Sequence, residues 1–184
     1  APSPDQNGNH WNSWRLTAVP AGSAISNLVM TSGDITPVSL YVTGSFDAPN
    51  GGSSFGGLME PDPALLGDFA VTQATEDYFC TGSTAKFKVT GLDRRFSYTL
   101  RFFGTRVMEG ATRTTRYTVV GYSGTFSTNM VTTGTDVGTG GYDGNNDTIA
   151  ELKGLMADMN GEMEVSVSKV DGYAYLNIME IRFE

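Results

Sequence analysis

Two alternating stretches joined by an arginine-bearing connection, within residues 91–121, constrain the fold more than any other feature of the chain. In the first, the apolar residues Tyr98, Leu100 and Phe102 alternate with polar ones. The second, residues 114–120, alternates in the same way. A period of two is typical of a β-strand with one buried side and one solvent-facing side. This segment therefore predicts two strands with no helix between them.

Further strand-like patterns recur along the chain, separated by glycine-rich or polar turns. They are expected at residues 25–30, 38–46, 77–81, 84–90, 125–131, 148–152, 162–170 and 173–183. About ten strands at short spacing predict an all-β protein built as a two-sheet antiparallel β-sandwich. Helix is expected to be minimal: one short turn that begins at Pro63 and ends at Gly67.

The length of the chain favours one domain. Its 184 residues, 39% of them hydrophobic, are enough for one sizeable core and too few for two ordinary domains. Residues 1–13 are polar and contain prolines, which predicts a flexible lead-in. Residues 14–184 are expected to form a single β-sandwich domain.

Charge and cysteine content exclude several classes of partner and site. A formal net charge of −8 opposes nucleic-acid binding, because a binder must bring cations to the phosphates. The sequence contains no run of eighteen apolar residues, so no membrane insertion is expected. One cysteine, Cys80, cannot form an intrachain disulfide, and with a single histidine it cannot complete a zinc shell.

The residue types give little support for a hydrolase. The only histidine, His10, lies in the expected lead-in, so a serine triad is not expected. Glycoside hydrolysis needs only two carboxylates, and several acidic residues fall in one region: Glu60, Asp62, Asp68, Glu76 and Asp77. The alternative is an ordinary solvated acidic loop.

Asp143, Asn145 and Asp147 have a spacing that lets alternate side chains face one calcium ion. Thr148 and Gly154 stand where an EF-hand needs glycine and an acidic ligand, so only an irregular calcium site is left as a candidate. Asn and Asp are also common turn formers, and a plain turn is the alternative. No other cofactor is predicted.

Sugar recognition asks for planar hydrogen-bond donors and for aromatic faces on which a ring can stack. Arg106, Arg113 and Arg116 lie in or beside one connection and could donate to sugar hydroxyls or to a uronate. Tyr142 and Trp11 are the candidate stacking residues, with Tyr122 and Tyr173 also at predicted loop edges. The alternative is that the arginines pair with acidic neighbours and hold a long loop.

Three segments carry a resemblance to a known family: KFKVTGLDRRFSYTLRFFGTR, TRTTRYTVVG and NGEMEVSVSKVDGYAYLNIMEIRF. Over roughly residues 75–184 the chain resembles the galactose-binding-domain-like modules of secreted bacterial polysaccharide-degradation proteins, and more distantly malectin-like domains. The resemblance implies a jelly roll that binds glycans through rim loops. It points to Arg106, to Arg113 and to the region of Asn146 in the later loop.

Together these patterns predict a non-catalytic carbohydrate-binding module whose partner is a poly- or oligosaccharide. The resemblance implies a secreted or cell-surface protein that works beside a catalytic domain or in a surface glycan-uptake complex. The polar, proline-containing opening resembles the tether that follows a cleaved export or lipoprotein signal, which predicts a lipid-tethered form. Two alternatives stay open: a structural or adhesive surface protein that binds no sugar, and a glycoside hydrolase that uses a carboxylate pair.

Overall fold

The computed structural model describes residues 1–14, 19–49 and 56–184. Strands dominate, and the helices are single turns. The strands are β1 (Ala24–Ile25), β2 (Ser39–Gly44), β3 (Ala48–Pro49), β4 (Phe79–Thr81), β5 (Thr84–Thr90), β6 (Tyr98–Phe103), β7 (Arg113–Gly121), β8 (Gly124–Gly138), β9 (Tyr142–Gly144), β10 (Ala150–Leu155), β11 (Met163–Asp171), β12 (Ala174–Leu176) and β13 (Ile178–Phe183). The helices are α1 (Pro63–Leu66), α2 (Thr72–Thr75) and the 3-10 turn η1 (Gly67–Phe69).

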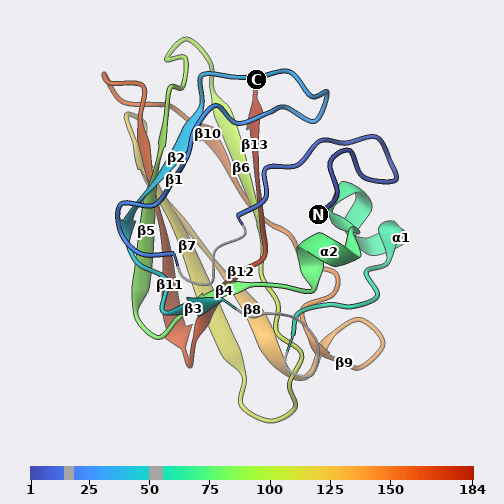
Figure 1. The fold of residues 1–184 in the computed structure, drawn as a ribbon. Coiled ribbons are helices and arrows are strands. Elements are labelled where there is room, and N and C mark those ends of the chain that lie inside the picture. The colour runs from blue at the N-terminus through green and yellow to red at the C-terminus, as the bar shows by residue number, and fades with distance from the viewer. Residues whose placement is uncertain (15–18, 50–55) are drawn as a thin grey trace.

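The strands form two facing layers, as predicted for an all-β sandwich. A large sheet has the order β1-β2-β5-β11-β7-β8-β9, and a small sheet has the order β10-β6-β13. All the strand pairs are antiparallel. A third set has the order β12-β4-β3, and its strand β12 leads directly into β13 of the small sheet. Figure 1 shows the two layers, with the helices beside the small sheet.

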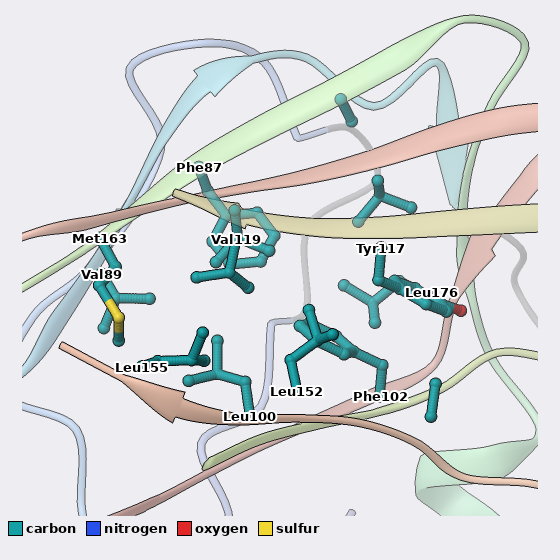
Figure 2. Close-up of a cluster of buried hydrophobic side chains, with 14 of the residues drawn as sticks. Phe87, Val89, Leu100, Phe102, Tyr117, Val119, Leu152, Leu155, Met163 and Leu176 are labelled. Atoms are coloured by element: carbon teal, nitrogen blue, oxygen red, sulfur yellow. The ribbon is translucent and has the colours of Figure 1, made fainter. Parts of the chain in front are cut away.

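The core lies between the two layers. Alternate residues of β5, β7 and β11 point inward to meet the inner face of β6 and β10, as Figure 2 shows. Phe102 of β6 stacks on Tyr117 of β7 with ring centroids 4.7 Å apart and planes 5° from parallel, which joins the layers directly. Both side chains are 0% exposed, and burying each such ring contributes about 1.5–3 kcal/mol to stability.

A second cluster covers part of the other face of the small sheet. Leu66 and Phe69 pack against Phe103, which is fully buried although it alternates out of phase with Phe102. The expectation of one wet face therefore fails in β6, where Thr99 and Phe103 are buried and Arg101 between them is partly buried. The helical turn predicted at Pro63 is confirmed as α1. Asp62 caps it, and the Asp62 carboxylate accepts from the Ala64 N–H at 2.8 Å. Neither η1 nor α2 was predicted.

The expected single strand at 173–183 is wrong, because the chain changes sheets at Asn177. Residues before it pair with β4 in the third sheet, and residues after it pair with β6. Asn177 holds the crossing point: its Oδ1 accepts from the Thr105 N–H and its Nδ2 donates to the Thr75 carbonyl, both at 2.8 Å. A switch of sheet breaks the simple alternation, so Ala174, Tyr175 and Leu176 are all buried.

The segment expected to be a lead-in makes hydrogen bonds with a neighbouring hairpin. The His10 N–H donates to the Thr31 carbonyl at 2.9 Å. The Asn12 amide bonds both backbone groups of Val29, at 2.8 and 2.9 Å. The division at residue 13 stays a prediction. In the part of the chain that the structure describes, no helix is long and apolar enough to cross a membrane.

Candidate functional site

The connection between β6 and β7 carries the chain from one layer to the other. It contains Arg106 and leads to Arg113, the first residue of β7. It begins at Gly104, where a Cβ would overlap the Tyr117 hydroxyl and lie 2.5 Å from the Tyr175 carbonyl oxygen. Only glycine fits this close approach. Arg106 follows two residues later, and Arg113 opens β7.

Side chains of β7 hold β12 in place of a backbone ladder. The Tyr175 N–H donates to Thr115 Oγ1 at 3.0 Å, and the Tyr117 hydroxyl donates to the Tyr175 carbonyl at 2.7 Å. Burial raises the pKa of Tyr117, so its hydroxyl stays protonated and remains a donor. These two bonds fix the backbone of Tyr175, and with it the direction of the Tyr175 ring.

Both arginines converge on the hydroxyl of Tyr175. Arg106 Nη1 donates to that oxygen at 3.3 Å, and Arg113 Nη1 donates to the same atom. Arg113 Nη2 lies 3.9 Å from the Met108 sulfur. Tyr78 packs edge-on against the Tyr175 ring, with centroids 4.9 Å apart. Residues from the β6–β7 connection, from β7 and from the segment before β4 therefore surround the Tyr175 side chain of β12.

An exposed aromatic ring flanks these groups. The guanidinium carbon of Arg113 lies 5.3 Å from the ring centroid of Tyr173, within the range of a cation–π contact. Tyr173 is 44% exposed, while Tyr175 is fully buried. Arg106, Arg113, Tyr78, Tyr173 and Tyr175 are called the arginine–tyrosine site below.

Electrostatics keep this site positive. Burial raises the pKa of Tyr78 to about 12, against an opposing effect of the nearby Arg106, so the phenol is neutral at pH 7. Within residues 1–14, 19–49 and 56–184, no carboxylate forms an ion pair with Arg113. Partly exposed guanidinium groups in this state can donate to hydroxyl, carboxylate or sulfate oxygens of a ligand.

Arg116 is not brought together with the other two arginines. Thr115 and Tyr117, its neighbours in β7, are buried on the inner face, so Arg116 points to the outer face of the large sheet. There its Nε donates to Asn129 Oδ1 at 3.0 Å. A binding role for Arg116 stays a prediction, separate from the arginine–tyrosine site.

The two predicted stacking residues pack elsewhere. Tyr142 in β9 and Trp11 are half-buried against the second hydrophobic cluster, which contains Leu58 and Phe69. The indole N–H of Trp11 donates to Asp5 Oδ2 at 2.8 Å. Their contacts are those of structural residues, and a role in stacking on sugar stays a prediction for both.

The loop of the candidate calcium ligands is a network of side-chain hydrogen bonds. The Asn145 amide, 1% exposed, donates to the carbonyls of Gly104 and Thr148. Asp147 Oδ2 accepts from the Thr139 N–H at 3.0 Å. Asn146 bonds both backbone groups of Thr139.

These bonds are those of a turn, the alternative interpretation of the segment. Asp143 Oδ1 likewise accepts from a backbone N–H, that of Asp136. Among the described residues no group of three or more His, Cys, Asp or Glu could hold a metal ion. Calcium binding by Asp143, Asn145 and Asp147 stays a prediction, as does ligand binding by Asn146.

The acidic segment behind the hydrolase alternative lies in and beside the short helices. Asp62 is the cap of α1, and Asp68 and Asp77 are exposed. The Glu76 carbonyl accepts from the Gly57 N–H. A carboxylate pair for glycoside hydrolysis stays a prediction.

Sequence reasoning missed Tyr78 and Tyr175 as members of the site. Both are in short stretches whose neighbours in space come from distant parts of the chain, and no spacing marks them. The separation of Arg116 did have a signal. Arg113 shares odd-numbered parity with the inward-facing Tyr117, and Arg116 does not, so a strand places the two arginines on opposite faces.

No family model matches the chain, and no curated protein matches it. Among solved structures it is similar to TmCBM61, a carbohydrate-binding module in complex with β-1,4-galactotriose, at 16% identity and a TM-score of 0.39, over 79% of this chain and 88% of that one. It is also similar to a GH29 fucosidase of Ruminococcus gnavus in complex with fucose, at 13% identity and a TM-score of 0.30, over 78% of this chain and 25% of that one. Similarity this distant decides neither the fold nor the function of the chain.

Proposed function

We propose that the chain is a non-catalytic carbohydrate-binding module that takes a poly- or oligosaccharide at the arginine–tyrosine site. The observation that carries this proposal is the convergence of Arg106 and Arg113 on the Tyr175 hydroxyl beside the exposed ring of Tyr173. Planar donors next to an accessible aromatic ring are the combination that saccharide recognition requires.

Hydrogen bonds and ring packing hold the side chains of the proposed site in place. The backbone of Tyr175 is bonded to Thr115 and Tyr117, and the Tyr175 ring packs against Tyr78. Because the shared hydroxyl orients both guanidinium groups, little side-chain freedom is lost when a ligand binds. Exposure of Tyr173 leaves an edge of the site open to solvent.

The proposal is tested by an affinity-gel and glycan-array screen of the purified chain, followed by calorimetry with the best ligand. Replacing Arg113 by Met keeps the apolar stem and removes the donors. Loss of a hydrogen bond to a charged group, about 1.5–3 kcal/mol, lowers affinity about 10-fold or more. The matched control is Arg94→Met, at an exposed arginine in the turn between β5 and β6.

Equal affinity of wild type and Arg113→Met, with both chains folded by circular dichroism, would move the saccharide away from this site. If the wild-type chain binds none of the neutral and acidic glycans, the proposed carbohydrate-binding function is wrong. The screen is run with and without calcium. Calcium-dependent binding that is lost in Asp147→Asn would support the predicted calcium loop. We also propose that the chain is secreted or displayed at the cell surface, which fractionation of the source cells tests.

One observation favours the adhesive alternative. Phe96 and Phe183 are 39% and 57% exposed, and their ring centroids lie 5.6 Å apart. They sit at the Tyr98 end of β6, opposite the end that leads to the arginine–tyrosine site. Exposed aromatic pairs can mark an interaction surface. Sedimentation that shows self-association, lost in Phe183→Ser, would favour this alternative over the module.

A further inference from the structure

The arginine–tyrosine site brings two positive charges close together. Arg106 Nη1 and Arg113 Nη1 both donate to the Tyr175 oxygen. Two donors bonded to one oxygen lie within roughly 6 Å of each other, since each hydrogen bond is about 3 Å long. Like charges at this separation repel, so the arrangement gains most from a ligand that supplies negative charge.

Other cations of the chain show what a neutralised arrangement looks like. Lys86 and Lys88 pair with glutamates of β11 or of the turn before it, at 3.1 and 2.6 Å. Arg101 pairs with both Glu151 and Glu180, at 2.9 and 2.7 Å. With a net charge of −8, the chain has carboxylates in excess. Among the residues that the structure describes, however, none pairs with Arg113.

The acceptors that Arg113 does have are weak. They are a phenol oxygen, of Tyr175, and a thioether sulfur, of Met108. Tyr78 adds no negative charge, because burial raises its pKa to about 12. A carboxylate or sulfate group can accept two parallel N–H bonds from one guanidinium, which neither of these acceptors can do.

We propose that the site selects saccharides that carry an anionic group, either the carboxylate of a uronic acid or a sulfate ester. This inference rests on the proposed saccharide-binding function and adds the class of ligand. The guanidinium group of Arg113 donates two parallel hydrogen bonds to the anion, with Arg106 beside it. The exposed ring of Tyr173 stacks on the adjoining sugar. The overall negative charge of the chain makes unspecific attraction to polyanions unfavourable, so local recognition is required.

The experiment compares polymers that differ only in charge. Calorimetry or affinity electrophoresis measures binding of the wild-type chain to polygalacturonate and to its methyl ester, which keeps the backbone and removes the carboxylate. A second arm uses a sulfated galactan and its desulfated form. We expect the acidic member of at least one pair to bind at least 10-fold more tightly than its neutral counterpart. The arm that shows the difference identifies the anion.

Two variants test whether Arg113 reads the charge. Arg113→Met should bring the acidic and neutral polymers to similar affinity, and Arg113→Lys should keep a reduced preference because it retains charge without the two parallel donors. Arg94→Met, at an exposed arginine in the turn between β5 and β6, should leave the preference unchanged. Urea unfolding of each variant separates loss of binding from loss of the fold.

The outcomes separate this inference from the function beneath it. Equal affinity for acidic and neutral polymers would overturn the charge selection and leave saccharide binding standing. A preference for acid that survives in Arg113→Met would also overturn it, because another part of the surface would then read the charge. Failure to bind any polymer would remove the proposed function and the inference together.

Discussion

Removing one hydroxyl, that of Tyr117, should destabilise the fold measurably, because this group replaces a backbone partner for β12. In Tyr117→Phe the ring keeps its 4.7 Å stack on Phe102, and the hydroxyl loses its bond to the Tyr175 carbonyl and its contact with the Thr115 side chain. That carbonyl belongs to a fully buried residue. A buried acceptor left without its donor costs about 1–3 kcal/mol.

Urea unfolding followed by tryptophan fluorescence measures this cost. We expect the midpoint to fall with an unchanged slope, since the area exposed on unfolding stays the same. In thermal melts of a chain of this size, each kcal/mol lowers Tm by about 2–4 °C. The matched control is Tyr41→Phe, whose side chain is 46% exposed and whose change should stay within about 0.5 kcal/mol.

The same variant should weaken ligand binding, because the Tyr175 carbonyl then loses its side-chain donor and β12 is held by the Thr115 contact and by its pairing with β4. Equal stability of Tyr117→Phe and Tyr41→Phe would refute the reasoning, since the Tyr117 hydroxyl would then contribute no more than an exposed one. A changed slope would show instead that the variant alters the unfolded or native ensemble.

Two further perturbations probe the packing and the charges of the fold. In Gly104→Ala the new Cβ overlaps the Tyr117 hydroxyl and lies 2.5 Å from the Tyr175 carbonyl oxygen. We therefore expect the free energy of unfolding, measured in urea, to fall by about 1–3 kcal/mol. An unchanged free energy of unfolding would show that the backbone at Gly104 can move to make room for a side chain. The N–H groups of Glu162 and Asn160 hold the pKa of Asp158 below its ordinary value of 3.8. A carboxyl with a lowered folded-state pKa contributes stability that is complete above the unfolded pKa and is lost as pH falls through the folded one. Asp158→Asn should therefore lose stability at neutral pH and show a flatter decline below about pH 4. The exposed Asp68→Asn serves as the control, and parallel acid curves for wild type and Asp158→Asn would contradict this account.

Strand positions could be predicted well where a strand has one buried face. The stretch at 84–90 is confirmed as β5 with the same bounds. The predicted turn at Pro63 is confirmed because capping by Asp62 and the proline ring act locally. The strand at 173–183 was wrong because its break at Asn177 depends on partners at Thr75 and Thr105, which are far away in the chain.

The candidate site was predicted only in part, and for a physical reason. Arg106 and Arg113 were named from the sequence, since donors near an expected loop are visible there. Their meeting point, the Tyr175 hydroxyl, was not predictable, because β12 packs on β7 through side chains and not through a regular ladder. Non-local packing of this kind leaves no period in the sequence.

The sequence alone determined the class of fold, because the alternation of apolar and polar residues acts through the geometry of each strand. It also determined the short helical turn, through capping contacts two or three residues apart. Only the tertiary structure decided that Arg113 and Arg106 meet at the Tyr175 hydroxyl. That outcome depends on which sheets bury which strand faces, and such pairings are made between residues separated by 58 to 69 positions in the chain.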